Sequence, residues 1–193
     1  MLEVDWTKWF FNFEAACQQS KQSRRPILLQ FHRLQCAGCR KMYAVTYPDQ
    51  EVSAELYDWF VPLRLDILKD HRIRSSYSAV WTPSFYFLDF RGKLLYSLPG
   101  YLPPEDFRIV MRMGLAAYHI PRAKYDDAIA ILTDGLEKFA SNPRAAALLF
   151  WRGMAQYLKG YDSQEFREAM TEIRESYPNS PEARMWPWED RFD

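Results

Sequence analysis

Several features that mark common classes of protein are scarce or missing in this chain of 193 residues. Three cysteines are too few for the disulfide framework of a small secreted domain. The 25 basic side chains are matched by 25 acidic ones, so net charge gives no reason to expect binding to nucleic acid or to an anionic membrane surface. No glycine-rich phosphate loop is present, and nucleotide chemistry is therefore not indicated.

The chain also lacks an apolar run long enough to cross a bilayer. Residues 1–6 have neither the basic start nor the apolar stretch of a secretory signal, so we expect a soluble protein in the cytoplasm, with no membrane partner. The histidines at positions 32, 71 and 119 are scattered along the sequence. Because a metal site needs several ligands that lie together, we expect no metal.

Apolar and aromatic residues, by contrast, are plentiful, at 48% and 17% of the chain, which is ample for a packed core. Residues 6–22 have the spacing of an amphipathic helix. Its apolar face carries Cys17 together with Trp6, Trp9, Phe10 and Phe13. We therefore interpret Cys17 as a buried, small apolar residue.

The most informative segment is Cys36-Ala37-Gly38-Cys39, which follows the apolar run 26–31 and opens a predicted helix. The first turn of a helix offers unpaired N–H groups and a partial positive charge, which stabilise a thiolate. Two intervening residues bring both sulfur atoms within bonding distance. The cations of Arg40 and Lys41 stand beside the pair in the sequence and would lower the thiol pKa further.

This pattern leaves three interpretations of Cys36 and Cys39 open. The pair is a redox-active dithiol, a vestigial or structural pair, or half of a zinc or iron–sulfur site. A metal site would need further ligands, and the chain has no second Cys-x-x-Cys motif. We favour redox chemistry, in which Cys36 attacks a disulfide and Cys39 resolves the mixed disulfide.

The hydrophobic pattern predicts strands at residues 27–32, 61–66, 84–88 and 94–98, with helices before, between and after them. The first of these strands is apolar on both faces, which is typical of a central strand. This order of elements predicts an α/β fold, with a mixed central sheet that is flanked by helices on both faces.

From residue 107 onward the pattern is helical throughout, and it contains an internal echo. The segment 114–118 resembles the segment 153–157, each starting with glycine and ending with tyrosine. We interpret the echo as stacked helical hairpins, with chance similarity of two amphipathic helices as the alternative. The aromatic ending 185–188 is expected to cap the fold or to contact another subunit.

With these elements in place, the chain resembles the thioredoxin superfamily over residues 5–118. The resemblance rests on the strand 27–32 followed by the Cys-x-x-Cys motif, on Thr82-Pro83 at the position of the family's cis-proline, and on the glycine of Leu98-Pro99-Gly100. The tail resembles tetratricopeptide repeats more loosely. We therefore expect a thioredoxin-like domain at residues 1–118, and an all-α helical-hairpin extension at 119–193 that packs on it.

The resemblance implies a protein thiol–disulfide oxidoreductase that needs no external cofactor. Its partners would be a protein or peptide disulfide and an electron donor of unknown identity. The catalytic residues would be Cys36 and Cys39. The residues that shape the substrate site would be Ala37, Gly38, Trp81, Thr82 and Pro83, with Leu34 and Tyr101 on the rim. The alternative is a redox-inert scaffold that binds a partner protein through its helical repeats.

Three positions depart from the family's pattern. Gln30 stands where thioredoxins have a buried aspartate, and an amide cannot relay a proton as a carboxylate does. Gln35 replaces the tryptophan before the motif, and Gly38 replaces the proline inside it. These departures favour a slower or more specialised oxidoreductase over a general reductase.

Overall fold

The computed structural model describes residues 3–185, so the predicted aromatic ending, from Trp186 on, lies outside the described residues. The chain divides into two compact units, Met1–Gly114 and Leu115–Asp193. The described residues of the first unit form a sheet with helices, and those of the second form helices only. The boundary expected at residue 118 falls within the same helix, α5, as the observed one.

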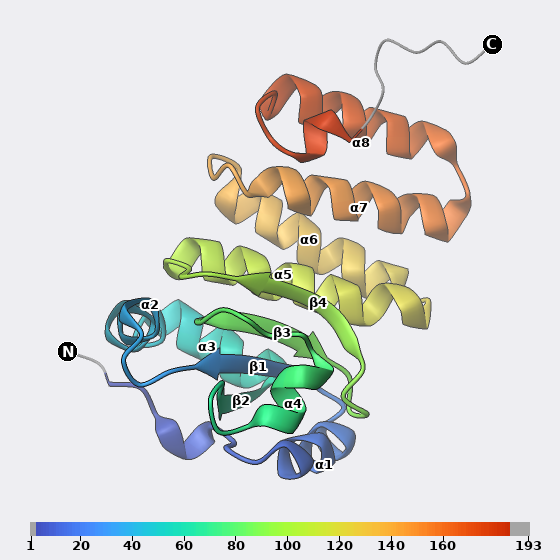
Figure 1. Ribbon diagram of the computed structural model, residues 1–193. Coiled ribbons are helices and arrows are strands. Elements are labelled where there is room, and N and C mark those ends of the chain that lie inside the picture. The colour runs from blue at the N-terminus through green and yellow to red at the C-terminus, as the bar shows by residue number, and fades with distance from the viewer. Residues whose placement is uncertain (1–2, 186–193) are drawn as a thin grey trace. The chain divides into compact units, whose positions relative to one another are not determined.

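A four-stranded sheet in the order β2-β1-β3-β4 forms the centre of the first unit (Figure 1). The strands are β1 Ile27–His32, β2 Val61–Asp66, β3 Ser84–Leu88 and β4 Leu94–Pro99. β1 pairs in parallel with β2 and antiparallel with β3, and β3 pairs antiparallel with β4. The predicted mixed sheet is confirmed, and the apolar strand β1 occupies an inner position.

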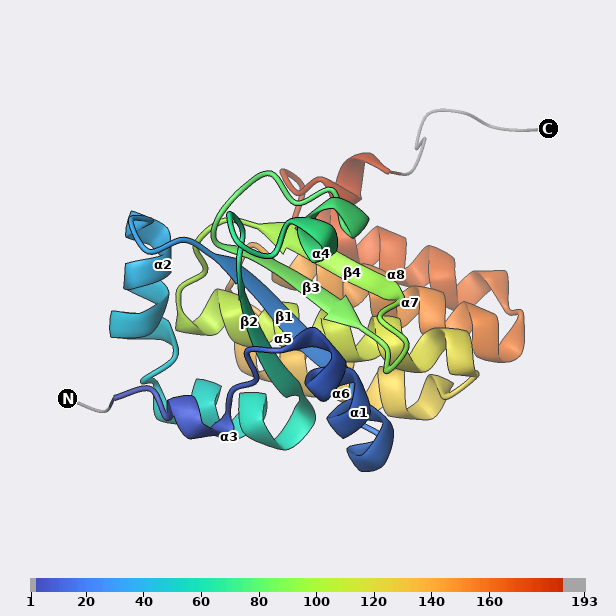
Figure 2. The same cartoon turned by 60° about the horizontal axis from the view of Figure 1, so that its bottom comes forward.

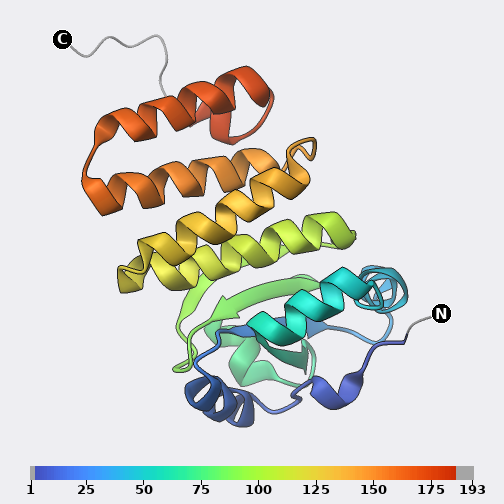
Figure 3. The same cartoon turned by 180° about the vertical axis from the view of Figure 1, so that it is seen from behind.

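Helices cover both faces of this sheet. They are α1 Phe13–Ser23, α2 Ala37–Lys41, α3 Gln50–Trp59, α4 His71–Ser76 and α5 Pro104–His119. A π-helical turn, Met42–Thr46, continues α2. In Figure 1 α4 lies in front of the sheet and α3 behind it, and Figure 3 shows α3 in front from the opposite side.

One face of the sheet packs against α1 and α4. Alternate residues of β1 point to this side, as the period of a strand requires: Ile27, Leu29 and Phe31. Cys17 on α1 is half-buried against the same cluster. Burial raises the pKa of its thiol, which agrees with a packing role rather than a reactive one.

The prediction of a single helix over residues 6–22 is wrong in its first half. Only Trp6–Lys8 form a 3-10 turn, and Phe10 then pairs with β2. Its N–H donates to the carbonyl of Pro62 at 2.8 Å. α1 begins only at Phe13, because the side chain of Asn12 accepts a hydrogen bond from the N–H of Ala15 and caps the helix.

The other face of the sheet has an aromatic core. The rings of Phe85 and Phe87 on β3 contact Phe107 and Phe60, with centroids 5.3 and 5.4 Å apart. Gly114 on α5 lies directly against the ring of Phe87, where a Cβ atom would come within 2.1 Å of the ring. Only glycine therefore lets α5 approach the sheet this closely.

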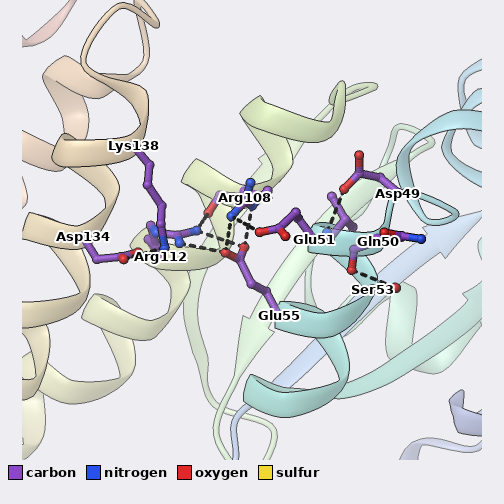
Figure 4. Close-up of polar contacts among 10 residues, drawn as sticks. Asp49, Gln50, Glu51, Ser53, Glu55, Arg108, Arg112, Asp134 and Lys138 are labelled. Carbon is purple, nitrogen blue, oxygen red and sulfur yellow. Dashed lines mark hydrogen bonds and ion pairs between the residues drawn. The ribbon is translucent and has the colours of Figure 1, made fainter.

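A buried ion-pair cluster joins α3 to α5 within the first unit (Figure 4). Glu55 accepts hydrogen bonds from Arg108 at 2.7 Å and from Arg112 at 2.8 Å. The side chain of Arg112 is fully buried and that of Glu55 is 11% exposed. Burial alone would raise the pKa of Glu55, but the two guanidinium groups outweigh it and hold this pKa below its ordinary value.

The second unit contains α6 Tyr125–Phe139, α7 Ala145–Gly160 and α8 Ser163–Ser176, which pack on one another in chain order. A Cβ atom at Gly153 would lie 2.6 Å from that of Ala169, so glycine permits the close approach of α7 and α8. The helical C-terminal region is confirmed, whereas its relation to tetratricopeptide repeats stays a prediction. Within residues 3–185, no helix combines the length and the apolar character that a membrane span requires.

Candidate active site

The loop from β1 leads into α2 (Figure 2). Cys36 ends this loop, and Cys39 lies within α2. Cys36 is the N-cap residue of α2, and its sulfur accepts a hydrogen bond from the N–H of Cys39 at 3.1 Å. Cys36 is half-buried, Cys39 is fully buried, and both are free thiols. Cys36 is therefore partly exposed to solvent, whereas Cys39 is not.

The pKa of the Cys36 thiol lies below its ordinary value. Burial opposes ionisation, but hydrogen bonds from the Cys39 thiol, from the Thr82 side chain and from the backbone N–H groups of Cys39 and Gly38 outweigh it. The expected influence of Arg40 and Lys41 is not the main cause. Arg40 is exposed, and the ammonium group of Lys41 lies over the Tyr101 ring, 4.6 Å from its centroid.

The pKa of the Cys39 thiol is shifted in the opposite direction, to about 12. Burial is the largest cause, and the neighbouring Cys36 sulfur adds to it. The Cys36 thiol therefore ionises at lower pH than the Cys39 thiol.

Thr82 and Pro83 lie directly against this pair. The peptide bond between them is cis, and Pro83 is buried. A Cβ atom at Gly38 would come within 2.8 Å of Pro83 Cδ, so the contact between α2 and Pro83 leaves no room for a larger residue at position 38. The Thr82 side chain hydrogen-bonds to both sulfur atoms. The structure thus brings together Cys36, Cys39, Gly38, Thr82 and Pro83.

The remaining predicted site residues lie at the surface. Ala37 is exposed, Trp81 is 62% exposed and Leu34 is 82% exposed. Tyr101 is half-buried beneath Lys41. Leu34, close to the Cys-x-x-Cys motif in the sequence, and Trp81, next to Thr82, are therefore large apolar side chains that stay in contact with water.

Polar groups without partners lie on the α2–α3 side of the sheet, and sequence reasoning found only one of them. Gln30 on β1 is fully buried, and neither polar atom of its amide has a hydrogen-bond partner in the described part of the chain. The hydroxyl of Tyr43 is likewise buried and unpaired among residues 3–185. Burial raises the pKa of Tyr43, with a smaller opposing effect from Arg64 and a further rise from Cys39. The spacing of four residues between Cys39 and Tyr43 is the signal that could have identified it.

Nothing in the described residues gathers three or more His, Cys, Asp or Glu side chains into a possible metal site. His32, the histidine nearest the motif in the sequence, has a lowered pKa because of burial and the charge of Arg64. The chemistry that this arrangement allows is that of the two thiols.

Comparisons with known proteins agree with this description. The family described as "Thioredoxin-like domain" matches residues 13–114. A thioredoxin from Thermus thermophilus has 22% identity and a TM-score of 0.50, with 58% of this chain and 87% of that chain covered. A proposed disulphide isomerase from Bacteroides thetaiotaomicron has 20% identity and a TM-score of 0.50, with 60% and 96% covered.

The oxidised C-terminal domain of DsbD from Neisseria meningitidis is also similar, with 19% identity and a TM-score of 0.45 over 51% of this chain and 92% of that chain. Among proteins with curated descriptions, no sequence matches the chain. At this level of identity, the structural similarities to the two proteins with a TM-score of 0.50 indicate the fold of the matched region.

Proposed function

The chain belongs to the family of thioredoxin-like domains, and from this we propose that it is a protein thiol–disulfide oxidoreductase that works through Cys36 and Cys39. The observation that carries the proposal is the asymmetry of the two thiols. Cys36 is half-buried with a lowered pKa, whereas Cys39 is fully buried with a pKa of about 12. A pair of cysteines with only a structural role would not require the two thiols to differ in exposure and in pKa.

The proposed exchange has two steps. The Cys36 thiolate attacks one sulfur of a substrate disulfide, a bond forms between them, and the other substrate sulfur leaves as a thiolate that takes a proton from solvent. Cys39 then loses its proton and attacks the Cys36 sulfur. The Cys36–Cys39 disulfide forms, and the substrate leaves with both sulfurs reduced. A thiol reductant returns the protein to its dithiol form by the reverse exchange.

Thr82 has a positioning role in this proposal. Its side chain hydrogen-bonds to the Cys36 sulfur and helps to lower the pKa of that thiol, so it favours the attacking anion. It also hydrogen-bonds to Cys39 and acts in the same direction there. Thr82 therefore supports the sulfur that carries negative charge at each stage of the exchange.

The second step is the slower one in this proposal. The Cys39 proton must be removed although burial, the largest cause of its shift, raises the pKa of this thiol. No carboxylate stands at position 30, and the amide of Gln30 cannot act as a base. This supports a specialised oxidoreductase with a long-lived mixed disulfide, in place of a fast general reductase.

The test is thiol–disulfide exchange between the reduced protein and a fluorescent peptide disulfide. Cys36→Ser should abolish exchange, because it removes the attacking sulfur. Cys39→Ser should stop after the first step and accumulate a protein–peptide mixed disulfide that is visible by mass spectrometry. Cys17→Ala is the matched control, since Cys17 packs in the core and should be dispensable for exchange.

Exchange that survives Cys36→Ser at the wild-type rate would contradict the proposal. It would favour the alternative, a redox-inert scaffold whose second unit binds a partner protein. A cytoplasmic location stays a prediction, and the sequence predicts neither the direction of exchange nor the identity of the electron donor. The equilibrium reduction potential of the pair against a glutathione buffer would decide the direction.

A further inference from the structure

We propose that the disulfides on which this protein acts belong to polypeptide partners with acidic residues beside the disulfide, and that a basic pocket next to the dithiol recognises these residues. The inference rests on the proposed exchange chemistry of Cys36 and Cys39 and narrows its substrate class.

The pocket has a volume of about 640 Å³. It is lined by residues of the loops that follow β1 and β2, of α4, and of the segment between α4 and β3. The guanidinium-bearing residues Arg33 and Arg74 line it, as do the hydroxyl-bearing residues Ser75, Ser78 and Thr82. All of these groups can donate hydrogen bonds, and none of the lining residues is acidic. A pocket lined by these donors can bind an anionic group that has several acceptor oxygens.

Two residues of the pocket wall also contact the dithiol. Thr82 hydrogen-bonds through its side chain to both sulfur atoms. The carbonyl of Arg33 accepts a hydrogen bond from the N–H of Cys36 at 3.2 Å. When a partner polypeptide presents its disulfide to Cys36, the partner's residues beside that disulfide can therefore enter the pocket.

In the described part of the chain, no carboxylate forms an ion pair with Arg33 or Arg74. Asp66 and Asp70, in and after β2, do not line the pocket, and their carboxylates accept hydrogen bonds from backbone N–H groups. Asp66 accepts a hydrogen bond from the N–H of Leu68, and Asp70 accepts one from the N–H of Asp66, each at 2.8 Å. Guanidinium groups bind carboxylates in a paired, bidentate geometry, so they favour Asp or Glu in a partner.

Apolar side chains at the same site favour a polypeptide over a small acidic thiol. Leu68 and Val80 also line the pocket, and they are 49% and 90% exposed. Trp81, next in the chain, is 62% exposed. A partner with apolar residues near its acidic ones covers this surface, whereas a small anion leaves it in water.

The experiment uses the reduced full-length protein and three synthetic peptides that share one disulfide loop. The residues on both sides of that loop are glutamate, glutamine or lysine. With an excess of a thiol reductant that returns the protein to its dithiol form, and with the uncatalysed rate subtracted, the rate of peptide reduction gives kcat/KM for each peptide. We expect the glutamate peptide to react about fivefold faster than the glutamine peptide, as two solvent-accessible ion pairs would give, and the lysine peptide to react slowest. The preference should act through KM and should shrink as salt is added.

Variants connect this preference to the pocket. Arg33→Gln combined with Arg74→Gln should bring the ratio of the rates for the glutamate and glutamine peptides close to one. Arg72→Gln is the matched control, because Arg72 is on the same helix as Arg74 but does not line this pocket, and it pairs with Glu14. It should leave the preference intact.

The outcomes separate the two proposals. Equal rates for all three peptides with the wild-type protein, or a preference that survives the double variant, would overturn the acidic-partner inference and leave the exchange chemistry standing. If none of the peptides is reduced, the proposed function fails, and the inference that rests on it fails with it.

Discussion

The sulfur of Cys36 accepts a hydrogen bond from the N–H of Cys39 at 3.1 Å, and so it caps the helix that carries the second cysteine. An N-cap oxygen or sulfur satisfies a backbone donor that the helix cannot satisfy itself. Here the acceptor is also the atom that must become an anion. The local interaction that starts α2 therefore also favours the reactive form of Cys36.

The first prediction concerns the pH dependence of alkylation. In Cys17→Ala protein, which leaves only the dithiol, iodoacetamide should modify Cys36 with a midpoint below that of an ordinary thiol, because the thiolate is the reacting form and the pKa of Cys36 is lowered. Cys39 should stay unmodified until strongly alkaline pH, since its pKa is about 12. Mass spectrometry of peptides gives the extent at each site. Joint titration of both thiols near the ordinary value would contradict the assignment.

The second prediction concerns the ion-pair cluster of Figure 4. Glu55→Gln should lower the free energy of unfolding by about 3 kcal/mol, because it removes the charge of a carboxylate that pairs with the fully buried guanidinium of Arg112. Glu51→Gln is the control: Glu51 also pairs with Arg108, but its side chain is 70% exposed, so we expect a loss of less than about 1 kcal/mol. Urea unfolding of both variants measures the difference, and equal losses would show that burial of the pair is unimportant.

The same cluster predicts how stability depends on pH. The pKa of Glu55 is lower in the folded chain than its ordinary value. Its contribution is therefore complete above the ordinary carboxyl pKa, and it is lost as the pH falls through the lower, folded value. Wild-type protein should lose stability over this acidic range more steeply than Glu55→Gln protein does.

The third prediction concerns the close contact between α5 and the sheet. Gly114→Ala should cost about 1–3 kcal/mol, because the new Cβ atom would overlap the ring of Phe87. Gly160→Ala is the control, since nothing lies within 4 Å of a Cβ atom at that helical position. It should be neutral or slightly stabilising. Thermal unfolding measures both, and a neutral Gly114→Ala would mean that the ring moves aside at no cost.

Sequence reasoning succeeded where one local pattern dominates. The doubly apolar run at residues 27–32 predicted an inner strand, and the strand is inner because both of its faces are buried. It failed at residues 6–12, because aromatic side chains at helical spacing are equally compatible with an extended segment. There the pairing of Phe10 with β2, a contact between distant parts of the chain, decides the conformation.

The same limit applies to the site. The motif itself identified Cys36 and Cys39, and the Cys39 thiol has the largest effect among the groups that lower the pKa of Cys36, but Thr82, the next of them, is brought to the sulfur only by the fold. Arg40 and Lys41, which were expected to lower this pKa, are close to Cys36 in the sequence, but the ammonium group of Lys41 contacts the Tyr101 ring. Likewise, nothing local links Glu55 to Arg112. Neighbours in the sequence are a poor guide to electrostatics that is set by tertiary contacts.

The last prediction concerns Gln30. Its amide is fully buried and unpaired within residues 3–185, and a buried polar group without a partner reduces stability. Gln30→Met keeps the length of the side chain and removes both polar atoms, so it should raise the free energy of unfolding by about 1 kcal/mol. Gln35→Met, at an exposed position, is the control and should change little.

Exchange kinetics of the same variant address the chemistry. Because an amide cannot accept the Cys39 proton as a carboxylate would, Gln30→Met should leave the rate of exchange nearly unchanged. A variant that unfolds more easily than the wild type would show that the amide has hydrogen-bond partners in solution. A variant that is more stable but exchanges much more slowly would instead assign Gln30 a part in the second step, since stability was then given up at this position for function.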